Sequence, residues 1–210
     1  YKAGAAITNS QANTFIGYNA ALTHTTGIRN IAIGFGAMDD TDRGNNSLDS
    51  EDNMFIGVDS GGGNWEDADS DYNVAIGNYT MDAGMNDANK NTAVGYVSLS
   101  DLTTGDDNTC LGYYAGARIT TGVENVVVGS TAADNITKGR YHVALGVNAL
   151  GAETIGDKSI AIGNHALGLQ VSGSDNAIAG NIGIGYDAGY YNVTGTNNTY
   201  VGYKAGVGAS

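Results

Sequence analysis

The segment NTAVGYVSL at residues 91–99 decides the fold, because the chain repeats it from one end to the other. Residues 108–116 read NTCLGYYAG, 17 positions later. Nine more copies keep the same frame, at 13–21, 30–38, 53–61, 73–81, 125–133, 142–150, 159–167, 181–189 and 198–206. Such internal repetition outweighs local secondary-structure preferences and indicates a stack of small, similar units.

Each copy has a glycine at its fifth position, which we call the anchor glycine. The anchor glycines are Gly17, Gly34, Gly57, Gly77, Gly95, Gly112, Gly129, Gly146, Gly163, Gly185 and Gly202. Most are 17 residues apart, and a second glycine often follows ten residues later, as at Gly105 and Gly122. Glycine corners favour turns and disfavour helices. The spacing therefore predicts a parallel β-solenoid of about 11–12 coils, each with two short extended segments.

The residue before the anchor glycine is always aliphatic, so we expect it to form the core ladder. Its members are Ile16, Ile33, Ile56, Ile76, Val94, Leu111, Val128, Leu145, Ile162, Ile184 and Val201. The residue before these points to the other face of the strand and is usually small or aromatic, as at Ala93 and Phe55. This second apolar face is a candidate interface with a partner chain.

Two further columns carry structural meaning. The position three residues after the anchor glycine is always Ala, Ser or Thr, which indicates a close approach of neighbouring atoms. Four residues before the anchor glycine, nine of the eleven copies have Asn, whereas His142 and Ser159 depart from the pattern. Stacked Asn side chains can form a hydrogen-bonded ladder along a solenoid.

Composition narrows the classes of function. The formal charge is −13, which argues against nucleic acid and anionic membrane surfaces as partners. Cys110 is the single cysteine, so no disulfide can form within the chain. No apolar run reaches the ~20 residues that a membrane-spanning helix needs. Residues 1–4 match residues 203–206, so we expect one repeat domain over 1–210, cut from a longer fibre.

The motif N-[TVI]-[AF]-[IV]-G-x-x-[AS] resembles the head repeats of YadA-like trimeric autotransporter adhesins. It is still more similar to repeats in bacteriophage tail fibres, best seen at residues 91–96, 108–113 and 198–203. The resemblance covers essentially the whole chain. It implies a left-handed β-roll, two further copies of the chain in a homotrimer, and a role as shaft or adhesive head.

Three insertions interrupt the repeat, near residues 39–52, 59–71 and 170–180, and insertions in solenoids often lie on the binding face. The first two are acidic, and carboxylates at Asp59, Glu66, Asp67, Asp69 and Asp71 make Ca²⁺ a candidate ligand, against a plain solvated loop. Trp65 is either a sugar-stacking platform for a receptor or a plug folded onto the rod. Tyr18, Tyr96 and Tyr113, directly after anchor glycines, are either packing residues or receptor contacts.

No catalytic constellation is recognisable, so we expect a non-enzymatic protein without a cofactor. The predicted function is a structural or adhesive segment of an extracellular fibre, on a virion tail or a bacterial surface. Its expected partner is a cell-surface glycan or protein receptor, with no direct membrane insertion. Two alternatives remain: a tailspike-type glycan depolymerase acting through paired carboxylates, and a calcium-dependent surface or matrix filament.

Overall fold

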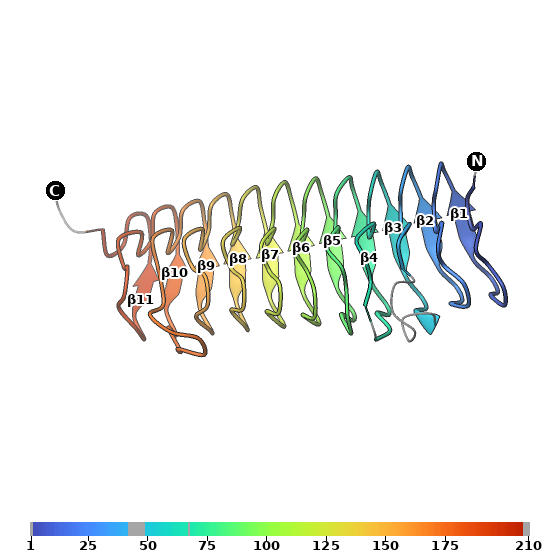
Figure 1. The fold of residues 1–210 in the computed structure, drawn as a ribbon. Coiled ribbons are helices and arrows are strands. Elements are labelled where there is room, and N and C mark those ends of the chain that lie inside the picture. Colours follow the sequence, from blue (N-terminus) through green and yellow to red (C-terminus); the bar gives the residue numbers. More distant parts are fainter. Residues whose placement is uncertain (1, 42–48, 67, 208–210) are drawn as a thin grey trace.

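The computed structural model describes residues 2–41, 49–66 and 68–207 as a rod of stacked coils (Figure 1). One sheet of eleven parallel strands runs along the rod, with the two ends of the chain at opposite ends. The strands, of three residues each, are β1 (Thr14–Ile16), β2 (Ile31–Ile33), β3 (Met54–Ile56), β4 (Val74–Ile76), β5 (Thr92–Val94), β6 (Thr109–Leu111), β7 (Val126–Val128), β8 (Val143–Leu145), β9 (Ile160–Ile162), β10 (Ile182–Ile184) and β11 (Thr199–Val201). The predicted all-β parallel solenoid of about eleven coils is confirmed.

The anchor glycines fix the register of the sheet. Val94 pairs with Leu111, and Leu111 with Val128, so equivalent residues of successive copies lie side by side. At Gly95 the backbone has a φ of 138°, and a Cβ there would overlap the carbonyl oxygen of Gly112 in the next coil. Only glycine meets both demands.

The second predicted extended segment is not a strand. Within the described residues, each coil holds one strand, and the rest of the coil consists of turns and bends. The far side still makes hydrogen bonds between coils, for example from the Thr103 nitrogen to the Thr120 oxygen at 3.0 Å. Gly105 lies there because a Cβ would overlap the carbonyl oxygen of Gly122. Close approach, and not a positive φ, therefore explains the second glycine.

The predicted core ladder is wrong, because the coil closes on the other face of the strand. The middle residue of each strand from β2 to β10 is buried, whereas the residues on either side of it are half-buried or exposed. Ile16 is 58% exposed and Val201 is 64% exposed. The middle residues therefore fill the interior of the coil, and the aliphatic ladder faces outward.

The interior is packed by volume compensation within each coil. Where the middle strand residue is Ala, as at Ala93, the buried residue four positions after the anchor glycine is large, here Leu99. Where the middle residue is Phe55, that position is Gly61, whose added Cβ would lie 2.5 Å from the phenyl ring. These coils thus fill the same interior with one large and one small residue, which keeps packing dense. In the coil of β10 both positions are glycine, Gly183 and Gly189, and Leu167 and Tyr200 of the neighbouring coils fill the space.

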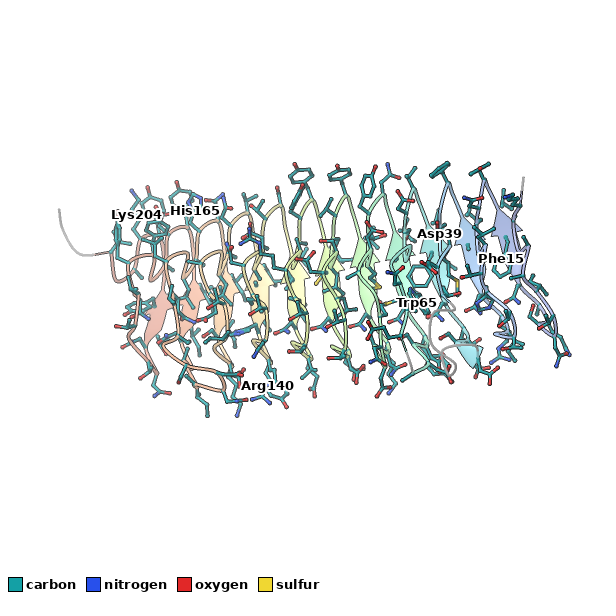
Figure 2. The ribbon with its side chains drawn as sticks, in the orientation of Figure 1. Phe15, Asp39, Trp65, Arg140, His165 and Lys204 are labelled. Carbon is teal, nitrogen blue, oxygen red and sulfur yellow. The ribbon has the colours of Figure 1, made fainter. Side chains whose placement is uncertain are left out.

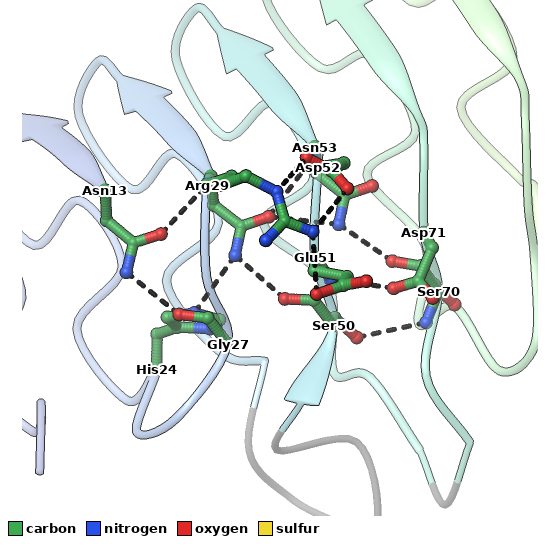
Figure 3. Close-up of polar contacts among 11 residues, drawn as sticks. Asn13, His24, Gly27, Arg29, Ser50, Glu51, Asp52, Asn53, Ser70 and Asp71 are labelled. Carbon is green, nitrogen blue, oxygen red and sulfur yellow. Dashed lines mark hydrogen bonds and ion pairs between the residues drawn. The ribbon is translucent and has the colours of Figure 1, made fainter. Parts of the chain in front are cut away.

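The predicted Asn ladder is confirmed inside the rod (Figure 3). The Nδ2 of Asn108 donates to Asn91 Oδ1 at 3.0 Å and to the Gly122 carbonyl at 2.8 Å, and Asn125 repeats the pattern one coil later. These side chains are fully buried. Each amide links its own coil to the preceding coil. The small residues Ser98 and Ala115 are buried, and Ser98 Oγ donates to the Cys110 carbonyl of the next coil at 2.9 Å, a close approach as expected.

Candidate functional site

The outer face of the sheet is a regular surface that extends over all eleven strands. Two columns of side chains point outward from the strands, the aliphatic residue before each anchor glycine and the residue two positions earlier. Of these 22 positions, 18 are Ile, Val, Leu or Met and the other four are Thr. Val126 and Val128, in the middle of the rod, are 40% and 36% exposed. The face that sequence reasoning assigned to the core is thus the exposed apolar surface.

A line of aromatic rings follows the edge of the rod just after the anchor glycines. Tyr18 stacks on Phe35 with ring centroids 5.3 Å apart, and Tyr96 stacks on Tyr113 at 5.7 Å. All four rings are exposed. Tyr18, Tyr96 and Tyr113 are therefore accessible, as a receptor contact requires, and such a contact stays a prediction.

Trp65 is not an exposed platform, which corrects that alternative. Its side chain is fully buried, its Nε1 donates to the Gly61 carbonyl at 3.1 Å, and its ring packs edge-on against Phe55 at 5.6 Å (Figure 2). The insertion thus supplies a large apolar side chain that fills part of the interior beside Phe55. Burial removes Trp65 from the candidate receptor contacts.

The acidic insertions do not form a recognisable calcium site in the part of the chain that the structure describes. No group of three or more His, Cys, Asp or Glu side chains there could hold a metal ion. Asp71 instead accepts a hydrogen bond from the Glu51 nitrogen at 2.7 Å, and Asp67 lies outside the described residues. Asp59 and Asp69 have pKa values raised by burial. The calcium proposal gains no support from this geometry.

The carboxylates of Asp39, Asp59 and Asp82, from three successive coils, lie close together on the surface of the rod. Burial, with the neighbouring charges of Asp59 and Asp40, raises the pKa of Asp39 to about 6. Burial, with Asp59 and Asp39, raises the pKa of Asp82 to about 6 as well. Asp39 and Asp82 are partly neutral near pH 6, and the repulsion among the carboxylates grows as the pH rises.

A buried polar network was missed by sequence reasoning. Glu153 is fully buried, and its Oε1 accepts hydrogen bonds from the backbone nitrogens of Thr154 and Gly156, both at 2.9 Å. Its Oε2 accepts from Gln170 Nε2 and Ser172 Oγ, also at 2.9 Å. Burial opposes the charge of Glu153, yet these donors together hold its pKa below the ordinary value.

This network replaces the Asn ladder where the ladder breaks. Glu153 and Gln170 occupy the interior position seven residues after the anchor glycine, which Ile119 and Ile136 fill in earlier coils. Gln170 bonds to Ser159 Oγ at 2.9 Å and to Asn181 Nδ2 at 2.8 Å, and so carries the ladder across the gap. The departures at His142 and Ser159 were the available signal for a change of interior chemistry.

The described residues contain no helix of the length and apolarity needed to cross a membrane. Comparison with protein-family models, with curated proteins and with solved structures found no match for this chain.

Proposed function

We propose that the chain is a structural and adhesive segment of an extracellular fibre, in which three copies stand side by side along their sheets. The observation that carries the proposal is the outward sheet face, apolar along all eleven strands. The repeat motif, similar to tail-fibre and adhesin-head repeats, supports the extracellular setting, the number of copies and a role in attachment to a host or surface.

The size of the face supports lateral association. Eleven strands about 4.8 Å apart, each three residues of about 3.3 Å, give a face of about 500 Å². Exposed apolar patches of this size on a single chain often mark binding surfaces. A standard interface buries about 800 Å² per partner, so the contact would extend from the sheet onto the flanking turns.

The shape of the face supports a copy of the same chain as its partner. Its outward side chains repeat with the coil spacing, so a parallel copy presents an equal ladder at equal intervals. Its columns carry no charged residue, and the nearest carboxylates along the chain, at Asp52, Asp107 and Glu124, come two residues before a strand. Contact between the columns would therefore bury apolar area without burying carboxylates.

The test is the mass of the folded protein in solution, measured by sedimentation equilibrium for the unaltered chain and two variants. We expect three times the chain mass for the unaltered protein. Val128→Asp, on the outward face, should yield single chains with an unchanged circular dichroism spectrum. Val171→Asp, at a residue that is 37% exposed and lies in the third insertion outside the sheet and its flanking turns, is the matched control and should leave the trimer intact. A stable monomer at micromolar concentration contradicts the proposal.

The depolymerase alternative is tested separately, by incubating the protein with capsular polysaccharide or lipopolysaccharide and measuring polymer size. A fall in size would replace the proposed adhesive role by an enzymatic one.

A further inference from the structure

We infer that a trough on the edge of the rod, between the coils of β7 and β10, binds one or two residues of a neutral saccharide. The trough is a cavity of about 380 Å³, and its lining includes Asp134, Asn148, His165 and Tyr190. This inference rests on the proposed function, because it supplies the attachment site of the fibre.

The trough exists because two consecutive coils lack a side chain at the same place. Five residues after the anchor glycine, neighbouring coils carry Ala117, Asp134 and Tyr190, but the two coils between Asp134 and Tyr190 carry Gly151 and Gly168. Elsewhere in the repeat only the coil of β3 has a glycine at this position, Gly62, so Gly151 and Gly168 are the one consecutive pair. Because these two side chains are absent, the backbone at Gly151 and Gly168 forms the floor of the trough. Asp134 closes one end of the trough and Tyr190 closes the other.

The ring of Tyr190 forms the aromatic end of the trough, and the absence of a side chain at Gly168 makes room for it. A Cβ added to Gly168 would lie 2.8 Å from the Tyr190 ring, so glycine is what allows the ring to lie over the floor. The ring is also 5.7 Å from the imidazole of His165 and 4.9 Å from the ring of Tyr191, between centroids. Tyr190 is half-buried, which leaves part of its surface open to a ligand.

The polar wall is held by contacts within the chain. Asn148 Oδ1 accepts a hydrogen bond from Thr131 Oγ1 at 2.5 Å, and Asn148 Nδ2 lies 3.3 Å from His165 Nε2. The other ring nitrogen of His165, Nδ1, lies 3.4 Å from Asp187 Oδ1. His165 is at the upper edge of the rod in Figure 2, the edge opposite Arg140. Both side chains are thus oriented before any ligand arrives, which lowers the entropic cost of binding.

The acidic end can accept hydrogen bonds. Asp134 Oδ1 accepts from Asn135 Nδ2 at 3.2 Å, which leaves lone pairs of the carboxylate available to a hydroxyl donor. Asn135 is fixed in turn by the Gly151 carbonyl at 2.6 Å and by Arg118 at 2.6 Å. The Asp134 carboxylate is therefore held at the end of the trough by a neighbour that is itself fixed by hydrogen bonds.

This set of groups matches the chemistry of a sugar ring. A pyranose has one face of C–H groups that packs on an aromatic ring and a rim of hydroxyls that bond to carboxylates, amides and imidazoles. The volume lies near the lower end of the range of about 300–1,000 Å³ for small-ligand sites, which suits one or two sugar units. The net charge of −13 disfavours acidic sugars, so the ligand is a neutral or N-acetylated hexose.

Saturation-transfer NMR tests this inference with the methyl glycosides of glucose, galactose, mannose, N-acetylglucosamine and N-acetylgalactosamine. We expect transfer to at least one glycoside. Tyr190→Ala should weaken its binding about tenfold or more by removing the stacking surface. Gly151→Leu should do the same by filling the trough, since an added Cβ at Gly151 has no neighbour nearer than 3.3 Å and its φ is not positive.

The control is Tyr113→Ala, which removes an exposed ring from the aromatic edge and should leave binding unchanged. No transfer to any of the five glycosides overturns the inference, as does binding that neither trough variant weakens. Loss of binding in Tyr113→Ala alone would place the site on the aromatic edge and overturn it as well.

The outcome is separable from that of the fibre proposal, because every group of the trough comes from one chain. Val128→Asp, the single-chain variant, should still bind the sugar. A trimer that binds no sugar refutes the inference and leaves the fibre proposal intact, whereas a monomer that binds sugar does the reverse.

Discussion

The two faces of each strand are both apolar, yet one builds the interior and the other the surface. At β7, Val127 is fully buried while Val126 and Val128, its neighbours in the chain, are exposed. The inner residue packs with a partner chosen for its volume, four positions after the anchor glycine. The outer residues have only neighbours of their own column. Hydrophobicity alone therefore does not tell inside from outside in a coil this narrow, whereas matched volumes do.

The largest expected effect comes from placing a charge on each face in turn. Val127→Asp would bury a carboxylate without a partner and should lower the free energy of unfolding by more than about 4 kcal/mol. Val128→Asp points to solvent and should change the stability of a single chain by less than about 1 kcal/mol. Urea unfolding followed by circular dichroism measures the free energy of unfolding of both variants. Equal losses of stability would contradict the assignment of an inner and an outer face.

Inner and outer aromatic residues should differ nearly as much. Trp65→Ala empties the interior beside Phe55 and removes a hydrogen bond, so we expect a loss of about 3–5 kcal/mol. Tyr113→Ala removes an exposed ring and should cost under about 1 kcal/mol. Thermal unfolding of the two variants gives the comparison. A loss of stability in Trp65→Ala as small as that in Tyr113→Ala would mean that the buried indole is not needed for stability.

The polar ladder gives a third contrast between the faces. Asn108→Ala removes the side-chain donor of the buried Gly122 carbonyl and the side-chain acceptor of the Asn125 backbone nitrogen, and should cost about 2–3 kcal/mol. Thr109→Ala, one residue later on the outward face, should be close to neutral. If chemical denaturation found the two substitutions equal, the ladder would have no special role in stability.

A compensating pair tests the packing rule itself. Ala93→Phe overfills the coil against Leu99 and should cost about 1–3 kcal/mol. Adding Leu99→Gly recreates the pairing of Phe55 with Gly61 and should restore most of that loss. Leu99 has a φ of 53°, which glycine adopts readily. A double variant no more stable than Ala93→Phe would show that the two positions do not share one space.

The smallest effect is a pH dependence on the outside of the rod. Because the folded pKa values of Asp39 and Asp82 are about 6, above the ordinary 3.8, the folded state binds more protons between these values. The free energy of unfolding should therefore fall as the pH rises from about 4 to about 6, and stay low above it. Asp82→Asn should raise the melting temperature at pH 7.5 by a few degrees and have little effect at pH 4.

The sequence determined the architecture in advance but not the sidedness of the strand. Coil length, register and the Asn ladder all follow from the spacing of one motif. The core was predicted on the wrong face of the strand, because the residue that is aliphatic in every copy was assumed to be buried. The pairing of Phe55 with Gly61, against Ala93 with Leu99, was visible in the sequence and pointed the other way.

Insertions were harder to interpret, because they leave the repeat and with it the register. Trp65 could lie in or out until its position was known. The trough could not be predicted either, because the sequence does not show that Tyr190 lines the same cavity as Gly151 and Gly168 of the two preceding coils. Contacts across coils, which no single copy of the motif contains, create such sites.

The hydrogen bonds that hold each coil to the next run along the axis of the rod, as from the Gly112 nitrogen to the Val94 oxygen at 2.8 Å. A pulling force applied along that axis would load these bonds one ladder at a time, from an end inward. Each coil of 17 residues that detaches would release about 60 Å of extended chain at about 3.5 Å per residue, and the coils with insertions would release more. Such a molecule would lengthen under tension coil by coil, in nearly equal steps over the regular coils, and each step would absorb part of the load.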